Sequence, residues 1–302
     1  MESNFIKSVN LQISDDQNEV YHGKKDYISA SGLKLLKVSP AHFKETKVEE
    51  ADAMKIGSAY HTLILEPEKF EKEYFVFDDR GIIEILVGEG SKKPRSTNQY
   101  KEWEEKQYSM ADGKTMLSLE DYETIKAMKD VLFKHYYAKS LLTNGIAEQS
   151  MYFSVTTEYD QLINVKIRPD YIKEKKRIIV DLKTTSDASV DGFQKNAASY
   201  DYQIQAALYA DLVEKSKKDN IPWTFIFIAQ EKKAPYAFNL FEASPQFIAH
   251  GRYEYEMLLL LYKHCLDTGK WNGYQVWCEN KFGINELNLP PWAIREINWF
   301  NH

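Results

Sequence analysis

The feature that most constrains the fold is a change in hydrophobic period near residue 150. Before it, apolar residues recur every three or four positions, as they do in helices, and the clearest such segment is 52–65. After it, apolar and polar residues alternate, which predicts antiparallel strands over 151–155, 162–167 and 177–182. The remainder is predicted to form a helix, a buried strand, its hairpin partner and a long helix over 199–216, 223–229, 236–241 and 245–267. This order predicts an α/β (α+β) fold with one central mixed sheet flanked by helices.

The length of 302 residues suits either two domains or one large α/β domain. Residues 1–26 are polar and weakly patterned, so we expect a flexible N-terminal arm. Residues 27–270 carry the predicted elements of one folded domain. The tail 271–302 contains Pro290-Pro291 and is expected to pack on the core or on a neighbouring subunit. The segment 78–96 is expected to be a long functional or mobile loop.

The composition excludes several classes of protein. Lys and Arg number 39 against 45 Asp and Glu, a net charge of −6, which does not fit a general polyanion binder but leaves room for an enzyme with one basic channel. No apolar run approaches the roughly 20 residues of a membrane span, and the N-terminus shows no export signal. The two cysteines, Cys265 and Cys278, cannot build a four-cysteine metal site. A cytoplasmic location and no membrane partner are therefore expected.

Two carboxylates interrupt the apolar strands of the second half. Asp181 and Lys183 are two residues apart at the end of a predicted strand, so their side chains share a face. Asp170 would lie near Asp181 at one end of the sheet if a hairpin runs through 173–176. Such charges are costly to bury unless they are paired or bind a metal. Taken alone, Asp181 and Lys183 would fit a solvent-facing pair on an edge strand. The presence of Asp170 on the preceding strand of the same hairpin favours a metal or catalytic site instead.

Further candidates stand at helical or strand positions along the chain. His61 ends a Gly-x-x-x-His pattern on one helix, and Glu148 opens the first strand of the second half. Gln205 and Tyr209 are four residues apart, on one face of a later helix. Each has an ordinary alternative, because a packed histidine, an exposed glutamate or a core tyrosine would fit the same positions.

Together, these residues resemble the PD-(D/E)XK nuclease superfamily. The elements are His61, Glu148, Pro169-Asp170, Asp181-x-Lys183 and Gln205-x-x-x-Tyr209. The similarity is strongest to the exonuclease VIII (RecE-type) branch, with the lambda-exonuclease and RecB nuclease groups as relatives, and it spans roughly residues 27–240. Strings such as Ser31-Gly-Leu-Lys34 and Tyr202-Gln-Ile-Gln205 also look like that branch. The resemblance implies a restriction-endonuclease-like core.

The resemblance also suggests roles for individual residues. Asp170 and Asp181, with the Leu182 carbonyl oxygen, would bind Mg²⁺, and Mn²⁺ could substitute because histidine is a softer ligand. Glu148 and His61 would complete the catalytic and metal-binding group. Lys183 would orient water or stabilise charge on the phosphate. The residues expected to hold the site or the DNA are Gln205, Tyr209, Arg168 and Lys166.

The activity implied is a 5′→3′ exonuclease that degrades linear double-stranded DNA in phage-type recombination or DNA repair. The resemblance further implies a homo-oligomeric ring of three or four subunits and a RecT-type single-strand annealing partner. Two alternatives remain open. One is a structure-specific endonuclease on the same core. The other is a catalytically silent protein that binds DNA ends, which the presence of Asp170, Asp181 and Lys183 disfavours.

Overall fold

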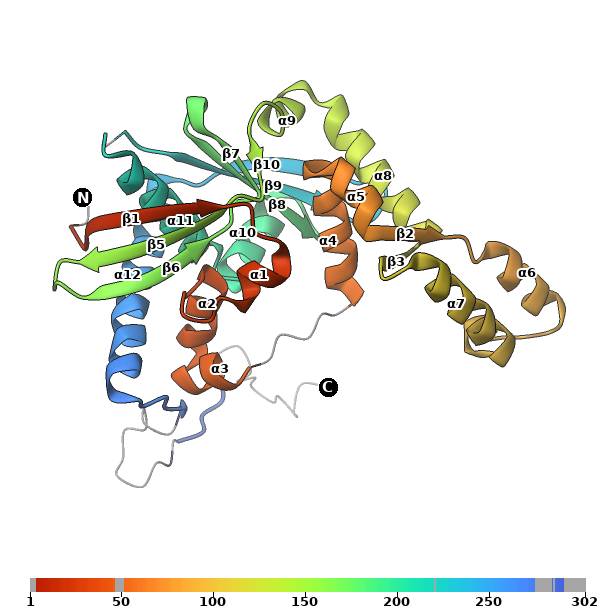
Figure 1. Ribbon diagram of the computed structural model, residues 1–302, viewed down its shortest axis with the longest axis horizontal. Coiled ribbons are helices and arrows are strands. Elements are labelled where there is room, and N and C mark those ends of the chain that lie inside the picture. Colours follow the sequence, from red (N-terminus) through yellow and green to blue (C-terminus); the bar gives the residue numbers. More distant parts are fainter. Residues whose placement is uncertain (1–3, 47–51, 220, 275–283, 285, 291–302) are drawn as a thin grey trace, which may run out of the picture.

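The structure, a computed structural model, describes residues 4–46, 52–219, 221–274, 284 and 286–290. The described strands form a five-stranded, a three-stranded and a two-stranded sheet. Helices cover the five-stranded sheet, and a mostly helical arm extends away from this body (Figure 1). The predicted α/β fold, with a central mixed sheet flanked by helices, is confirmed.

The five-stranded sheet carries the centre of the molecule. Its strand order is β10-β9-β8-β7-β4. Strands β8 and β9 run parallel, and the other neighbours are antiparallel. In the same order, the strands are Phe238–Glu242, Thr224–Glu231, Ile178–Thr185, Tyr171–Lys173 and Ile146–Ala147. The β8 and β9 sequences are rich in Ile, Val and Phe because both of their faces are covered.

Two hydrophobic cores lie on opposite faces of this sheet. On one face, Phe225 and Phe227 pack with residues of α11 and α12. On the other face, Ile226 and Ile228 pack with residues of α4 and α8. The helices of the body are α1 Asn18–Gly23, α2 Ala30–Val38, α3 Pro40–Glu45, α4 Asp52–Leu65, α5 Pro67–Glu73, α8 Leu119–Lys134, α9 Tyr136–Leu141, α10 Val190–Ser199, α11 Tyr202–Lys217 and α12 Pro245–Thr268.

The three-stranded sheet corrects the expectation of a flexible arm over 1–26. Here β1 (Ile6–Ser14) pairs antiparallel with β5 (Ser150–Thr157), which pairs with β6 (Leu162–Ile167). Within β1, Val9 and Leu11 are partly buried against the core that contains α11. Val9, Leu11 and Ile13 alternate with polar residues, which is a strand signal, but it is short because Ile6 is out of phase with them across a register shift.

The predicted strands of the second half of the chain are divided between two sheets, the three-stranded and the five-stranded one. The chain leaves β6 at Arg168-Pro169 and enters β7 in the five-stranded sheet, so β6 and β8 lie in different sheets. Proline has no backbone N–H to continue a ladder, which accounts for a break at this position. The predicted β5–β6 hairpin and the predicted pairing of β9 with β10 are both confirmed.

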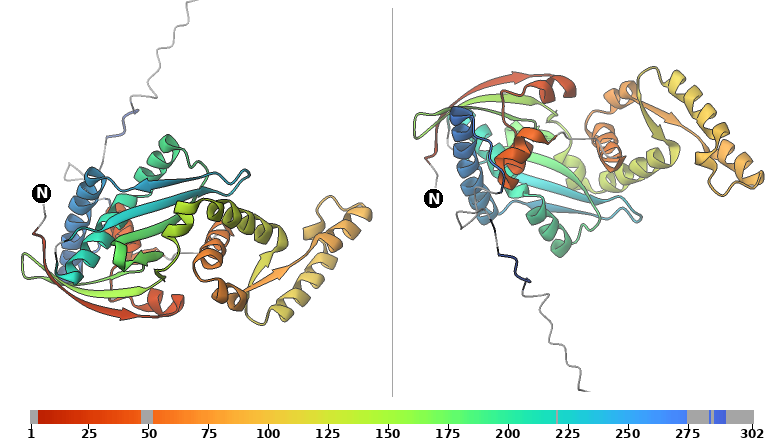
Figure 2. Two further views of the ribbon diagram at one scale, coloured as in Figure 1. Left: turned by 90° about the horizontal axis from the view of Figure 1, so that it is seen from above. Right: turned by 90° about the horizontal axis from the view of Figure 1, so that it is seen from below.

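Residues 74–118 build the arm, which projects from the body at the end opposite the N-terminus (Figure 2). It contains β2 Tyr74–Phe77, α6 Arg80–Gly88, a 3₁₀ turn Pro94–Ser96, α7 Asn98–Ala111 and β3 Thr115–Ser118, with β2 and β3 parallel. The long loop expected over 78–96 is therefore partly helix. The start of α6 is joined to the 3₁₀ turn and to α7, because Asp79 Oδ2 accepts hydrogen bonds from Arg95 Nε and from the Tyr100 hydroxyl, both at 2.9 Å.

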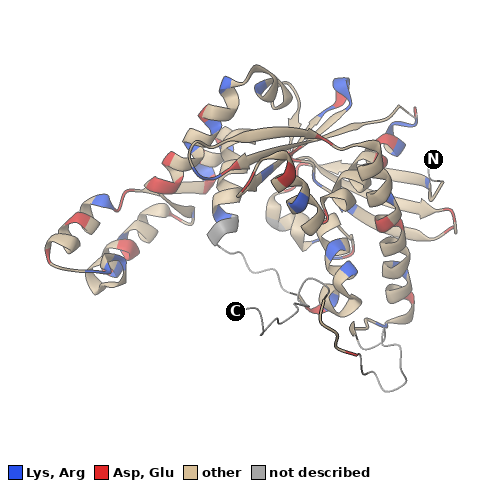
Figure 3. Ribbon diagram, turned by 180° about the vertical axis from the view of Figure 1, so that it is seen from behind, with Lys and Arg blue, Asp and Glu red and all other residues tan. Residues whose placement is uncertain are grey.

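Charged residues of both signs are interspersed along the helices of the body and of the arm (Figure 3). No helix in the described part of the chain is long and apolar enough to cross a bilayer. At the start of the expected C-terminal tail, the Trp271 ring stacks on Phe43 with a centroid distance of 5.5 Å. Most of the tail beyond residue 274, and Cys278 with it, lies outside the described residues.

Candidate functional site

The β7–β8 hairpin brings two predicted carboxylates to one end of the sheet. Tyr171 pairs with Val180, so Asp170 and Asp181 follow at the next position of the two strands. The backbone N–H of Leu182 donates a 2.7 Å hydrogen bond to Asp170 Oδ2. The hairpin through 173–176 is thus formed as predicted, with a short 3₁₀ turn over Glu174–Lys176.

Glu148 lies beside Asp170 because β4 is the other neighbour of β7. Its backbone N–H donates to the Asp170 carbonyl oxygen at 3.1 Å. Glu148 has φ of +48°, a left-handed conformation that is rare and costly for a residue with a Cβ. The chain turns sharply at this residue, between β4 and β5, and the turn places the carboxylate next to Asp170.

Helix α4 supplies the third member of the group. His61 Nδ1 lies 3.5 Å from Asp170 Oδ2. One ligand atom each from His61, Glu148 and Asp170 lies within 4.8 Å of the others. Two ligands of one divalent cation, each at about 2.1–2.5 Å, are at most about 4–5 Å apart, so this spacing fits a single ion.

The pKa values show how strongly these acids interact. Burial, together with the negative charge of Asp170, raises the pKa of Glu148 to about 9. Burial and the negative charge of Asp181 raise the pKa of Asp170 to about 6. Crowded carboxylates of this kind are stabilised in their charged form by a nearby cation. The donor set therefore fits a divalent metal ion in chemistry as well as in spacing.

Asp181 is held slightly apart from that group. It is 1% exposed, forms a close ion pair with Lys183, and accepts a 2.6 Å hydrogen bond from Gln205 Nε2. Gln205 was expected to hold either a side chain of the site or the DNA, and in the structure it contacts Asp181. Metal binding by Asp181 and by the Leu182 carbonyl oxygen stays a prediction, because these contacts do not test it.

Two side chains of the site were missed by the sequence reasoning. Lys34 Nζ and Lys183 Nζ each lie 5.0 Å from the ring centroid of Tyr202. Burial, and then the positive charge of Lys183, lowers the pKa of Lys34 to about 8. Both Lys34 and Tyr202 occur in the strings that resemble the RecE-type branch, which was the available signal.

The other predicted DNA-binding residues support the fold instead. Lys166 Nζ donates to the Tyr21 and Lys24 carbonyl oxygens at 2.6 and 2.8 Å. Arg168 Nε donates to the Ser150 hydroxyl at 3.0 Å, and its guanidinium also contacts residues 16 and 18.

Tyr209 is buried in the core, with its ring centroid 6.3 Å from that of Phe225. Lys166, Arg168 and Tyr209 are each at most 9% exposed, so their assignment to DNA contacts is corrected. Lys166 and Arg168 bind the N-terminal segment, and Tyr209 packs in the hydrophobic core.

Comparisons with known proteins agree with this architecture. A family model described as "PDDEXK-like domain of unknown function (DUF3799)" matches residues 29–281. The crystal structure of a protein from Eubacterium rectale, named "putative exonuclease", is similar with a TM-score of 0.59 and 14% sequence identity, over 92% of this chain and 96% of that chain. At this identity the likeness shows the fold alone. No curated protein matches the chain.

Proposed function

This chain belongs to the PDDEXK-like domain family, and on that basis we propose that it is a divalent-metal-dependent nuclease. The superfamily predicted from the sequence motifs is thereby confirmed, whereas the RecE-type branch stays a prediction. The observation that carries the proposal is the convergence of His61, Glu148 and Asp170 within 4.8 Å, beside the Asp181–Lys183 pair. An arrangement of three acids, a histidine and a lysine at one sheet end suits hydrolysis of a phosphodiester.

His61, Glu148 and Asp170 would hold the ion, with Asp181 as a further candidate ligand. Oxygen ligands favour Mg²⁺, and the histidine makes Mn²⁺ a suitable substitute. A bound divalent cation supplies charge relief at the phosphate and lowers the pKa of a water molecule. Lys183 and Lys34 place two ammonium groups next to the site, where they would attract the phosphate backbone and stabilise negative charge on it.

The finer proposal is an exonuclease that acts on linear double-stranded DNA, 5′→3′, in recombination or repair with a RecT-type annealing partner. It is supported by the motif resemblance and by the exonuclease name of the Eubacterium rectale protein. The competing proposals are a structure-specific endonuclease and a silent DNA-end-binding protein.

The test compares linear duplex labelled at one 5′ end with covalently closed circular DNA, in Mg²⁺, Mn²⁺ or EDTA. Metal-dependent loss of linear DNA from its ends, with intact circles, is expected. Asp170→Asn should be inactive, whereas the matched control Asp160→Asn should be active, because Asp160 is exposed in the β5–β6 turn. Cutting of circles would favour the endonuclease. No cleavage of either DNA in either metal would contradict the nuclease proposal.

A further inference from the structure

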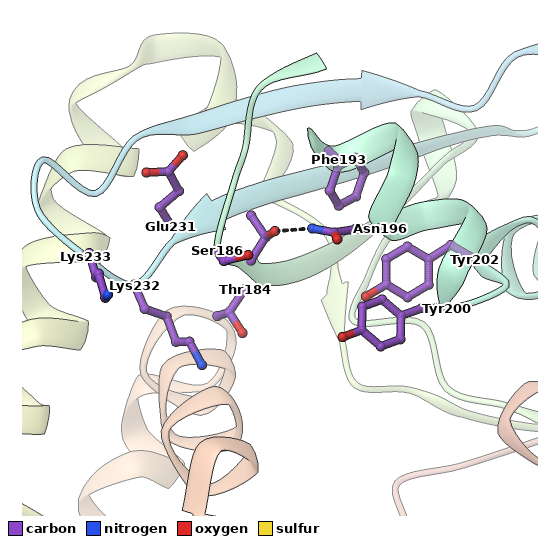
Figure 4. Close-up of a pocket in the computed structure, with 10 residues that line it drawn as sticks. Thr184, Ser186, Phe193, Asn196, Tyr200, Tyr202, Glu231, Lys232 and Lys233 are labelled. Carbon is purple, nitrogen blue, oxygen red and sulfur yellow. Dashed lines mark hydrogen bonds between the residues drawn. The ribbon is translucent and has the colours of Figure 1, made fainter. Parts of the chain in front are cut away.

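A second hollow adjoins the catalytic strand. It has a volume of about 340 Å³ and begins at Thr184, directly after Lys183. The end of β8 lies at its centre, the α10–α11 junction forms one side, and the β9–β10 hairpin forms the other (Figure 4). Its lining includes neither Lys183 nor any candidate metal ligand, so it is a separate pocket next to the proposed active site.

Two stacked tyrosines form one side of this pocket. The Tyr200 and Tyr202 rings have a centroid distance of 5.7 Å and an interplanar angle of 22°. Tyr200 is 61% exposed, so part of its ring is open to solvent. Tyr202, the other ring of the pair, lies next to the proposed active site, since its ring centroid is 5.0 Å from Lys183 Nζ. The two stacked rings therefore extend from Lys183 to the solvent-exposed side of the pocket.

The opposite side is cationic and the centre is polar. Lys232 and Lys233 lie across the pocket from the tyrosines (Figure 4), and neither forms an ion pair within the described part of the chain. Glu231, the acid nearest them in sequence, accepts a 3.0 Å hydrogen bond from the backbone N–H of Ala188. Asn196 Nδ2 donates to Thr185 Oγ1 at 2.7 Å and lines the same pocket.

We propose that this pocket binds one unpaired nucleotide of a DNA strand next to the phosphate that is cut. The base would stack on Tyr200, and Lys232 and Lys233 would contact the flanking phosphate. Base–aromatic stacking is tolerant of sequence, because every base has a π-face. The volume lies in the range of small-ligand pockets. The inference rests on the proposed nuclease function and deepens it, since the substrate must present a strand whose last base pair has opened.

The experiment measures binding in EDTA, where the proposed metal-dependent cleavage does not proceed. The probes are a natural single-stranded oligonucleotide and a fully abasic strand of equal length. Tyr200→Ala should weaken binding of the natural strand by about 5- to 100-fold and leave binding of the abasic strand unchanged. Tyr159→Ala is the control, because Tyr159 is equally exposed, at 61%, but lies in the β5–β6 turn. Replacing both Lys232 and Lys233 by alanine should weaken both strands.

The pocket assignment is overturned if Tyr200→Ala binds the natural strand as tightly as the unaltered protein does. It is also overturned if a free deoxynucleoside monophosphate competes as well as the strand does, because the pocket would then be a nucleotide site. Cleavage by the unaltered protein in Mg²⁺ and Mn²⁺ is measured in parallel. Absence of cleavage counts against the nuclease function. If Tyr200→Ala weakens binding of the natural and the abasic strand equally, that result counts against the pocket.

Discussion

Lys183 is a buried ammonium group whose neighbours fix its charge. Burial lowers the pKa of Lys183, but the carboxylates of Asp181 and Asp170 outweigh that effect and raise the pKa overall. The ammonium therefore stays protonated at and well above neutral pH. This favours an electrostatic role for Lys183 over a role as a general base.

The contacts of Asp181 change what its substitution is expected to do. Repulsion from Asp170 alone would make Asp181→Ala harmless to folding, but the carboxylate also pairs with Lys183 and accepts from Gln205. We predict that Asp181→Ala abolishes cleavage and lowers the free energy of unfolding by about 3–5 kcal/mol, because it leaves a buried ammonium without its partner. Asp181→Asn should also abolish cleavage, but it should lower the free energy of unfolding by less than Asp181→Ala does. Urea unfolding of both variants tests this, and an Ala variant as stable as the unaltered protein would contradict it.

The raised pKa values of Glu148 and Asp170 predict how pH affects the metal-free protein. A carboxyl group with a raised pKa keeps its proton in the fold while the unfolded chain loses it. Stability should therefore fall as pH rises from the ordinary carboxyl range toward about 9, the pKa of Glu148. Glu148→Gln should remove most of this slope, and thermal unfolding in EDTA across that range measures it.

The same pKa values predict stronger cation binding at higher pH. A metal ion competes with the protons on Asp170 and Glu148, whose pKa values are about 6 and about 9. The affinity for Mn²⁺, measured by calorimetry, should therefore rise steadily between these two values. Lys183→Met should keep this rise, because Lys183 is not a proposed ligand. A pH-independent affinity would argue against these carboxylates as ligands.

Sequence reasoning located the acids of the site better than the residues around them. Asp170 and Asp181 were found because carboxylates stand out at the ends of β-branched strands. Lys34 and Tyr202 were missed because an exposed lysine and a surface tyrosine have the same sequence signature. Their contact with the site depends on how α2 packs beside α11, which no local pattern encodes.

At the scale of elements, a buried polar contact positions α4 and with it His61. The Tyr60 hydroxyl donates to Gln230 Oε1 on β9, and both residues are 0% exposed. Gln230 Nε2 donates in turn to the Met128 and Tyr236 carbonyl oxygens at 2.9 and 3.0 Å. Helix α4 is thus joined to the central sheet one residue before the candidate metal ligand.

We predict that Tyr60→Phe lowers the free energy of unfolding by about 1–3 kcal/mol, because the buried Gln230 oxygen loses its donor. Tyr253→Phe is the control, since Tyr253 is 64% exposed on α12 and should show no measurable change. Denaturant titration compares the two. Equal stability of both variants would mean that the contact contributes little to holding α4.

Elements with strong periodicity were predicted well, and elements with mixed signals were not. Helix α4 has the predicted bounds 52–65, and the Ser39-Pro40 start of α3 has its cap, since Ser39 Oγ accepts from the His42 N–H at 3.3 Å. Helix α6 lies in the segment 78–96, for which the Gly and Lys content predicts a loop. In the arm, the helix buries Leu86.

For the whole molecule, a net charge of −6 makes DNA binding depend on local groups of basic residues. We predict that affinity for duplex DNA falls with salt, with a log–log slope of about −0.9 for each phosphate contacted. Fluorescence anisotropy over a salt series gives that slope. An affinity independent of salt would exclude a basic channel as the binding surface.

We predict that the protein forms a closed homo-oligomer that loads only at DNA ends. Closed symmetric assemblies are the common state of soluble oligomers. A ring around duplex DNA would keep acidic residues outward, and it would have no route onto covalently closed circles. Light scattering should therefore give about three to four times the 35.2 kDa of one chain. A monomer that also cuts closed circles would contradict both the ring and the exonuclease, and it would leave the endonuclease as the function of this site.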